Sequence, residues 1–255
     1  MFVFSVEFSW KSIQIPHNLF CQFFRKLINM YSILLLSGGK GCRMQDSTPK
    51  QYLLLAGKPM IMHSIERFDR INEISEIVIV CESSYRDVIS QMAREYNITK
   101  KIVFADAGES RQGSVFNGLR MVRSEFVIIH EAARPFVRTD EFLRLINEKE
   151  QNVTYGYDIP FTVLKGKSYV NGILNRAELI NVQLPQKFHV KTLLDAHKKA
   201  MEAGDVYTED ASLLFNIEKS DIKVMRGTSY NIKITDPIDL LLGEIIYKNY
   251  ITNRK

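Results

Sequence analysis

The sequence predicts an α/β fold: a Rossmann-like, mostly parallel sheet flanked by helices, with a protruding β-arm. From residue 31 onward, short and continuously apolar runs rich in β-branched residues alternate with amphipathic stretches of helical period. This spacing is typical of right-handed crossovers and of parallel strands that are covered on both faces. The alternation breaks once, over residues 152–188, where β-prone segments surround two turn signals.

Four segments are expected to form the parallel strands, and three amphipathic stretches are expected to connect them. The strands are 31–36, 76–80, 101–105 and 125–130, and the helices lie within 59–71, 84–97 and 111–123. The carboxyl ends of these strands would form one edge of the sheet. Such an edge is the usual ligand site in folds of this class.

Residues 158–178 are expected to form the protruding arm. Turn signals at Lys165-Gly166-Lys167 and Asn171-Gly172 predict an extended hairpin within it. An arm without a core of its own usually packs on another surface, often a second subunit. The sequence therefore predicts a homodimer that forms through this arm.

The pattern beyond the arm returns to helices. It predicts helices over 189–203 and 208–218, a strand that begins at Ile222, and a last helix that is opened by Asp236 and Pro237. We expect the apolar stripe of the last helix to lie in the core. This stripe consists of Ile238, Leu241, Leu242, Ile245 and Ile246.

Length and composition indicate one domain over residues 30–255. Of the 255 residues, 45% are hydrophobic and 25% are charged, an ordinary balance for a globular protein. Residues 1–29 do not fit a signal peptide, because Glu7 and Lys11 interrupt their apolar run. We expect them to be a poorly ordered extension ahead of a biological start at Met30, with an interfacial helix over 17–28 as the alternative.

Charge and cysteine content exclude several classes of protein. The formal net charge is +5, which is too small and too dispersed to indicate a nucleic-acid partner. Three cysteines without metal-ligand spacing indicate a reducing compartment, and hence a cytoplasmic protein without a disulfide framework. No run approaches the roughly 20 apolar residues of a membrane span, so no membrane partner is expected.

The segment SGGKGCRMQDSTPK, residues 37–50, is a candidate phosphate-binding loop behind the first strand. Its glycines allow backbone N–H groups to approach an anion closely. The order of residues is not that of a P-loop, and Met44 stands where a dinucleotide fingerprint needs glycine. Arg43 and Lys50 add two cations, which favours a triphosphate, although such a turn can also be purely structural.

Five segments in order resemble the cytidylyltransferases of methylerythritol phosphate and ribitol phosphate. They are GGKGCRM (38–44) with PKQYLLLAGKPM (49–60), GESRQGSVFNGL (108–119), HEAARPF (130–136), QLPQKF (183–188) with TEDAS (208–212), and YNIKITDPIDL (230–240). The resemblance extends from Tyr31 to about Tyr250. It implies a single nucleotidyltransferase domain in which a phosphate oxygen of a polyol phosphate attacks the α-phosphorus of CTP and pyrophosphate leaves.

The resemblance also implies roles for individual residues. Cations would carry the catalysis, because an anionic phosphate needs no general base to attack; these catalytic residues are Arg43, Lys50 and Lys233. The nucleotide-binding residues are Ser37, Gly38, Gly39, Gly41, Gly108, Glu109, Arg111 and Ser114. The substrate-binding residues are Glu131, Arg134, Thr162, Arg176 and Thr208. Glu131 would also be the protein ligand of Mg²⁺ or another divalent cation.

Departures from the family pattern leave the acceptor open. Glu109 and Glu131 stand where the family has aspartate, Leu184 stands where it has threonine, and the acidic order of Glu209 and Asp210 is reversed. The first expectation is 2-C-methyl-D-erythritol 4-phosphate, in isoprenoid precursor synthesis. Ribitol 5-phosphate and a catalytically silent CTP-binding homologue are the alternatives, and the intact cations argue against the silent one.

The five histidines are not expected to take part in the chemistry. His130 is expected to be a hydrogen-bonded structural residue, because nothing in the implied reaction needs a base there. No recognisable constellation is formed by the other four, which are His17, His63, His189 and His197.

Overall fold

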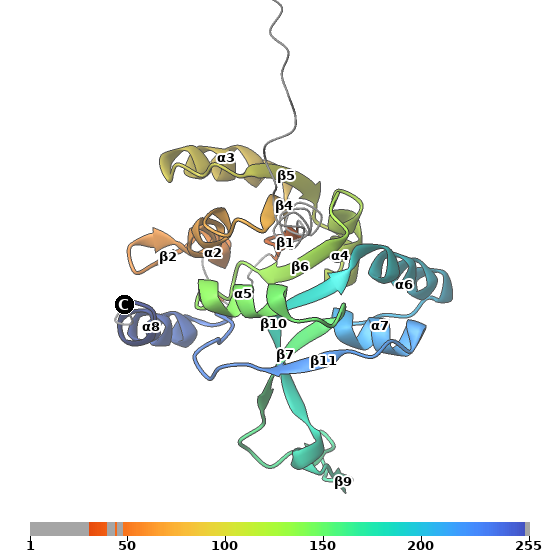
Figure 1. Cartoon of the computed structure of the whole chain (residues 1–255). Helices are drawn as coiled ribbons and strands as arrows, with labels where there is room; N and C mark the ends of the chain where they lie inside the picture. Colours follow the sequence, from red (N-terminus) through yellow and green to blue (C-terminus); the bar gives the residue numbers. More distant parts are fainter. Residues whose placement is uncertain (1–30, 40–43, 45–47, 253–255) are drawn as a thin grey trace, which may run out of the picture.

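The computed structural model describes residues 31–39, 44 and 48–252, and every structural statement below refers to these residues. The predictions for residues 1–29 and Met30 therefore lie outside the described part of the chain. The centre of the molecule is a seven-stranded sheet of order β11-β7-β10-β6-β1-β4-β5 (Figure 1). Two small sheets pair β2 with β3 and β8 with β9.

The elements have the following bounds. The strands are β1 (Tyr31–Leu36), β2 (Leu54–Leu55), β3 (Lys58–Pro59), β4 (Ile74–Cys81), β5 (Lys101–Asp106), β6 (Phe126–Glu131), β7 (Val153–Asp158), β8 (Leu164–Lys165), β9 (Gly172–Ile173), β10 (Ile180–His189) and β11 (Lys223–Arg226). The α-helices are α2 (Met60–Asp69), α3 (Arg86–Glu95), α4 (Arg111–Leu119), α5 (Thr139–Asn147), α6 (Val190–Ala203), α7 (Asp210–Glu218) and α8 (Pro237–Ile246). Short helical turns are η2 (Lys50–Tyr52), η3 (Ser83–Tyr85), η4 (Arg176–Glu178) and the π-helical η5 (Tyr247–Thr252).

The mostly parallel sheet expected from the sequence is confirmed. Strands β6, β1, β4 and β5 are parallel neighbours, and their bounds lie within two residues of the predicted ones. β10 runs antiparallel to both β6 and β7, and β11 is parallel to β7. Antiparallel β10 thus joins the parallel half of the sheet to a smaller second half.

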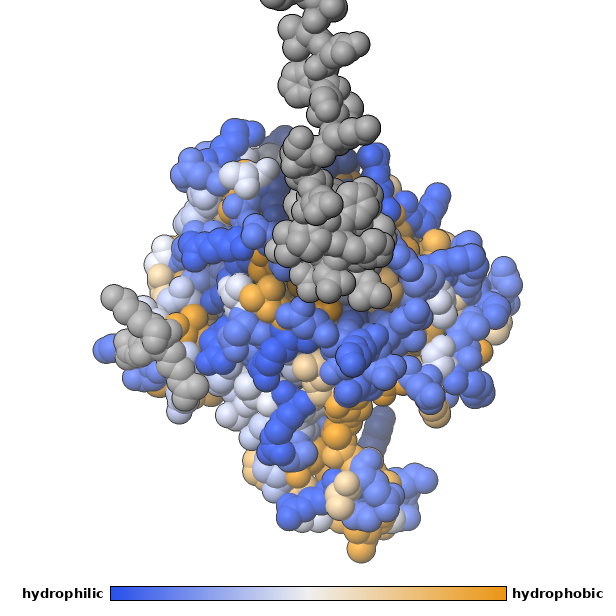
Figure 2. Space-filling view, viewed as in Figure 1, coloured by the Kyte–Doolittle hydropathy of each residue, from blue (hydrophilic) through white to orange (hydrophobic). Residues whose placement is uncertain are grey.

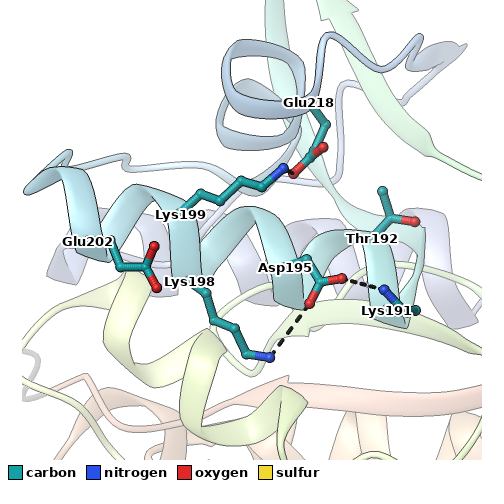
Figure 3. A pocket seen from close by; sticks show the side chains of 7 residues that line it. All are labelled: Lys191, Thr192, Asp195, Lys198, Lys199, Glu202 and Glu218. Atoms are coloured by element: carbon teal, nitrogen blue, oxygen red, sulfur yellow. Dashed lines mark hydrogen bonds and ion pairs between the residues drawn. The ribbon is translucent and has the colours of Figure 1, made fainter.

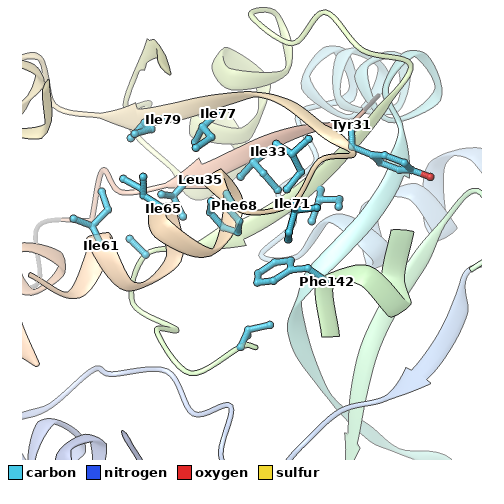
Figure 4. Packing of buried hydrophobic residues seen from close by; sticks show 14 of the residues in the cluster. Tyr31, Ile33, Leu35, Ile61, Ile65, Phe68, Ile71, Ile77, Ile79 and Phe142 are labelled. Carbon is cyan, nitrogen blue, oxygen red and sulfur yellow. The ribbon is translucent and has the colours of Figure 1, made fainter. Parts of the chain in front are cut away.

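Two hydrophobic clusters cover the two faces of the sheet. Ile33 and Leu35 of β1 face a first cluster with Ile61, Ile65 and Phe68 of α2 (Figure 4). Leu34 points the other way, into a second cluster that includes side chains of α4, α6 and α7. Successive strand residues face opposite sides, so a strand covered on both sides has to be apolar throughout. This is why the strand segments lack the usual polar alternation.

Helix α8 does not lie as the sequence predicts. It begins as expected, with Pro237 in the first turn and the Asp239 carboxylate accepting a hydrogen bond from the Asp236 N–H at 2.9 Å. The expectation that its main apolar stripe lies in the core is wrong, because Leu241 is 65% exposed. Ile238, Leu242 and Ile245 are also exposed, whereas Ile246 packs against a third, smaller hydrophobic cluster. This cluster consists of Leu55, Met60, Ala133, Phe136 and Ile234.

The sequence of α8 explains this error. The helix is apolar around most of its circumference, so its pattern alone does not select the face that becomes buried. The structure turns Gly243 inward, where an added Cβ would lie 3.0 Å from Leu55 and 3.1 Å from Phe136. A small residue at this position allows α8 to approach the body of the protein closely on that side.

The segment 159–179 connects β7 to β10 and lies at the bottom of Figure 1. Its only strand pairing among the described residues is the short ladder of β8 with β9. Large apolar side chains are exposed along it, and Tyr169 reaches 87% exposure. The others are Phe161, Leu164, Val170, Ile173 and Leu174. Figure 2 shows apolar surface on this projection and where it joins the body.

Candidate active site

Three parallel strands end at the same edge of the sheet and deliver the candidate site residues there. β1 leads into Ser37, β5 leads into the loop that contains Gly108, and β6 ends at Glu131. Because parallel strands point the same way, residues distant in the sequence meet at this edge.

Glu131 is the centre of a cluster of cations. Its Oε2 lies 2.7 Å from Nζ of Lys233 and 3.8 Å from Nε of Arg134, and its Oε1 lies 3.4 Å from Nε of Arg111. Burial by itself would raise the pKa of this carboxyl group, but the charges of Lys233, Arg111 and Arg134 lower the pKa to about 2. Glu131 is therefore ionised at neutral pH and holds three positive side chains together.

Lys233 reaches this cluster because its loop is fastened at several points. The backbone N–H of Ile234 donates to Ala133 O at 2.8 Å, and Nη1 of Arg134 donates to Asn231 O at 3.0 Å. The side chain of Asn231 donates to Leu184 O at 2.7 Å. The loop between β11 and α8 is thereby tied to the residues that follow β6 and to β10.

Glycine allows two loops of the site to pack closely. A Cβ added to Gly38 would lie 2.6 Å from Cβ of Ala107, and one added to Gly108 would lie 2.6 Å from the carbonyl carbon of Gly113. The Gly108 N–H donates to Oγ of Ser114 at 3.0 Å, and Ser110 caps α4 by accepting from the Gly113 N–H at 3.0 Å. The loop after β5 thus folds tightly on the first turn of α4.

Lys50 lies in the turn η2, which is tied to the residues directly after β1. Gln51 fixes this turn by donating through Nε2 to Ser37 O at 2.7 Å and to Gly39 O at 3.1 Å. Lys50 is buried and lies near Asp239 at the start of α8. The expected residues Gly41 and Arg43 lie outside the described residues.

The structure gives no contact between the Glu131 cluster and three of the expected substrate residues, Arg176, Thr162 and Thr208, within the described part of the chain. Nη1 of Arg176 donates to Pro160 O at 2.9 Å, so its hydrogen bond stays within the projecting segment, which also carries exposed Thr162. Thr208 is exposed and precedes α7 by two residues. Glu109 is exposed on the loop before α4.

The structure adds Asp210 and His197, which the sequence did not assign to the site. Nη2 of Arg111 lies 2.7 Å from Oδ2 of Asp210, and Nε2 of His197 lies 3.2 Å from Oδ1 of the same carboxylate. The expectation that His197 belongs to no constellation is therefore wrong. No spacing pattern links residues 111, 197 and 210, and the TEDAS segment that contains Asp210 is the single sequence signal for this contact.

His130 has the surroundings expected of a structural residue. Its Nε2 lies 3.0 Å from Arg134 O, and its ring packs edge-on against Phe68 and Phe142. Burial lowers the pKa of His130 to about 3, so the ring is neutral at neutral pH. A fully buried, neutral ring of this kind supports the turn that carries Arg134 and does not face a substrate.

Comparison with known proteins gives the family. Residues 31–249 match the family model described as IspD: 2-C-methyl-D-erythritol 4-phosphate cytidylyltransferase. The chain belongs to this family. The resemblance seen in the five motifs is thereby confirmed.

Relatives with this family name match most of this chain. The enzyme of Geobacillus thermodenitrificans is 37% identical over 229 residues, which cover 87% of this chain and 98% of the relative. The chloroplastic protein of Oryza sativa subsp. japonica is 35% identical over 219 residues, which cover 84% of this chain and 73% of the relative. The crystal structure of 4-diphosphocytidyl-2C-methyl-D-erythritol synthase from Anaerococcus prevotii superimposes with a TM-score of 0.76 at 28% identity. The match covers 86% of this chain and 96% of that structure.

The site offers limited ligands for a metal ion. Among residues 31–39, 44 and 48–252, no three His, Cys, Asp or Glu side chains are grouped as a metal site would require. Mg²⁺ is commonly held by one or two carboxylates together with substrate phosphates. Ionised Glu131 fits such an ion only if CTP supplies most of the oxygen ligands.

A cavity of about 440 Å³ lies elsewhere, on the outer surface of α6 and α7 (Figure 3). Its lysines already have acidic partners: Lys191 and Lys198 pair with Asp195 at 2.6 and 3.5 Å, and Lys199 pairs with Glu218 at 2.9 Å. None of its lining residues belongs to the family motifs or to the Glu131 cluster. We therefore place the candidate site of this cytidylyltransferase-family protein at the sheet edge.

Within the described part of the chain, no helix is long and apolar enough to cross a membrane.

Proposed function

We propose that this protein is a CTP-dependent cytidylyltransferase that transfers CMP to 2-C-methyl-D-erythritol 4-phosphate, in isoprenoid precursor synthesis. The observation that carries this proposal is the convergence of Arg111, Arg134 and Lys233 on Glu131 at the carboxyl edge of the parallel strands. A site with surplus positive charge suits two polyanionic substrates. Membership of the family supports the choice of acceptor.

The reaction is an in-line exchange at the α-phosphorus of CTP. A phosphate oxygen of the acceptor forms a new bond to this phosphorus, and the bond to the β-phosphate oxygen breaks, so that pyrophosphate leaves with the electron pair. The nucleophile is already an anion, so no side chain has to remove a proton from it. Catalysis then depends on positioning and on charge stabilisation in the transition state.

Lys233 is suited to stabilising the charge that develops. Its ammonium group has three N–H donors, and the contact to Oε2 of Glu131 uses one of them. The remaining donors are available for phosphate oxygens, while Glu131 keeps the side chain at the site before any ligand arrives. Arg43 and Lys50 would contribute further positive charge toward the triphosphate from the loop after β1.

The nucleotide would lie against the loops that contain Gly38 and Gly108. Glycines permit close approach of the backbone to the base and phosphates, and the N-terminus of α4 favours negative charge nearby. Glu131 would hold Mg²⁺ jointly with the phosphates of CTP. The ion would supply additional neutralisation of phosphate charge.

The acceptor site would be completed by the projecting segment of a second subunit. The exposed apolar side chains of residues 159–179 support a homodimer, in which Arg176 and Thr162 are donated across the interface to the polyol phosphate. We place this activity in the cytoplasm, where CTP is available.

Pyrophosphate release tests the proposed activity. Purified protein is supplied with CTP, Mg²⁺ and either 2-C-methyl-D-erythritol 4-phosphate or ribitol 5-phosphate. We expect release with the first acceptor and at least tenfold lower kcat/KM with the second. Preference for ribitol 5-phosphate would overturn the acceptor assignment. Saturable CTP binding without release with either acceptor would favour a silent homologue.

A pair of lysine variants tests the site. Lys233→Ala should lower kcat/KM by at least 100-fold, because it removes a donor for the reacting phosphates. Lys223→Ala is the matched control, since Lys223 lies on β11 and pairs with Glu148 at 3.3 Å. Equal activity of the two variants would remove Lys233 from the mechanism. Circular dichroism establishes that both are folded.

A further inference from the structure

A chain of three polar side chains leads from the candidate site into the interior. Arg111 begins at the site, Asp210 is the next member, and His197 of α6 ends the chain; Asp210 and His197 are almost fully buried. We propose that Asp210 and His197 are positioning residues that hold the Arg111 guanidinium and, through it, the nucleotide loop of the site. This inference rests on the proposed CTP site.

The Arg111 guanidinium is held between two carboxylates. Its Nη2 contacts Oδ2 of Asp210 at 2.7 Å, and its Nε faces Oε1 of Glu131 at 3.4 Å. Although burial by itself would lower the pKa of Arg111, the charges of Asp210 and Glu131 raise it. Arg111 therefore stays charged, with one contact in the interior and one at the edge of the site.

Asp210 cannot release Arg111 without cost. Burial by itself would raise the pKa of the Asp210 carboxyl group, but the Arg111 charge and the His197 hydrogen bond lower it to about 2. Water does not reach this carboxylate, so rotation of Arg111 toward a ligand would leave a buried charge poorly compensated. The contact thus restricts Arg111 to one orientation.

His197 supports the same carboxylate from the other side. Nε2 donates to Oδ1 of Asp210, and Nδ1 is buried without a hydrogen-bond partner among the described residues. Among the described residues, the His197 ring therefore makes a hydrogen bond to Asp210 alone. A donor at this point leaves Oδ2 of Asp210 to face Arg111.

A second contact joins the same segment to the start of α4. Oε1 of Gln112 accepts from the Tyr207 N–H at 2.8 Å, and Nε2 of Gln112 donates to Asp205 O at 3.2 Å. Residues 205–210 thus brace the first turn of α4, on which the Gly108 loop folds. Loss of these contacts should therefore change the affinity for the nucleotide more than the affinity for the acceptor.

The test measures the Kd of CTP by calorimetry on folded full-length protein. Asp210→Asn should raise this Kd at least tenfold, because the neutral amide no longer fixes Arg111. The KM of the acceptor should change less than threefold. Asp195→Asn is the matched control on the surface of α6 and should leave the Kd unchanged, because Asp195 pairs with exposed lysines.

A double-mutant cycle separates positioning from general destabilisation. Asp210→Asn added to Arg111→Met should weaken CTP binding no more than twofold beyond Arg111→Met alone, because both changes remove one interaction. Effects that multiply would overturn the inference. A merely structural role would reduce the folded fraction and leave the Kd of the folded protein unchanged, which would also overturn it.

Replacing His197 provides a second route that keeps Asp210 intact. His197→Asn retains a donor and should keep the Kd within threefold, whereas His197→Leu should raise it at least fivefold. Equal CTP affinities of His197→Asn and His197→Leu would overturn the role of His197. This comparison remains decisive if Asp210→Asn does not fold. Binding of CTP decides this inference even if no acceptor is turned over, so its failure is distinguishable from failure of the proposed activity.

Discussion

At the scale of single residues, Glu131 has two effects on the site. It attracts three cations that would otherwise repel one another, and it leaves a surplus of positive charge for a polyanion. The electrostatic repulsion among Arg111, Arg134 and Lys233 is thereby overcome during folding, before a ligand binds. Preorganisation of this kind is the main source of electrostatic catalysis.

Acid should destabilise the protein through two buried histidines. Nε2 of His63 lies 2.8 Å from Leu55 O, and Nε2 of His130 lies 3.0 Å from Arg134 O. Burial lowers the pKa of His63 to about 4 and that of His130 to about 3, from 6.5. The neutral rings contribute their full stability above pH 6.5, and this contribution is lost as the pH falls toward the folded-state values.

Urea unfolding at several pH values between 7.5 and 5 measures this effect. Each histidine should lower the free energy of unfolding by up to about 1.4 kcal/mol per pH unit below pH 6.5. His63→Gln should make the dependence shallower by about one proton. An unchanged slope in this variant would contradict the assignment. Above pH 5, Glu131 and Asp210 contribute little to this pH dependence. A carboxyl group with a lowered pKa loses its stabilising effect only as the pH falls below its ordinary pKa, which is 4.5 for Glu131 and 3.8 for Asp210.

At the scale of elements, the site depends on loops that approach one another closely. The Gly108 loop contacts the backbone of α4, the Gly38 loop contacts Ala107, and the Lys233 loop is tied to Ala133. Each of these contacts joins the ends of different strands or helices. A small displacement of one element would therefore be transmitted to the cations.

A pair of glycine substitutions tests this dependence. In Gly108→Ala the new Cβ would lie 2.6 Å from the Gly113 carbonyl carbon and 2.7 Å from the Ser114 nitrogen, so the backbone has to move. We expect the stability to fall by about 1–3 kcal/mol and CTP affinity to fall at least tenfold.

The control for this substitution is Gly113, which lies in the first turn of α4. In Gly113→Ala the nearest atom to the new Cβ is Oγ of Ser110 at 3.4 Å, an ordinary contact. Because alanine favours the helix, stability should be unchanged or higher by about 0.5–1 kcal/mol. Calorimetry and thermal unfolding of both variants provide the comparison. Similar losses in the two would argue against a special requirement at Gly108.

At the scale of the whole molecule, the projecting segment stands out against a well-packed body. Its apolar side chains are exposed, and the hydrogen bond from Arg176 to Pro160 O stays within this segment. An acceptor site that uses Arg176 from a second subunit accounts for both observations. The proposed homodimer thus connects an exposed surface to a catalytic requirement.

Complementation between two inactive variants tests donation of Arg176 across a dimer. Lys233→Ala and Arg176→Ala should each have little activity alone. Coexpression should restore about a quarter of wild-type activity, since half of the random dimers are mixed and each contains one complete site. If Arg176 acts within its own subunit, coexpression will restore none. Light scattering establishes the oligomeric state independently, and a monomer at assay concentration would contradict the proposal.

The sequence by itself determined the parallel strands, the helices between them and the family. These features depend on local properties: continuous apolar runs predict strands covered on both faces, and five ordered motifs indicate one family. The buried face of α8 and the Arg111–Asp210–His197 chain were decided only by the tertiary structure. An almost wholly apolar helix has no preferred face until it meets Leu55 and Phe136. Residues 111, 197 and 210 become neighbours only when three helices pack together, and no short-range pattern records that contact.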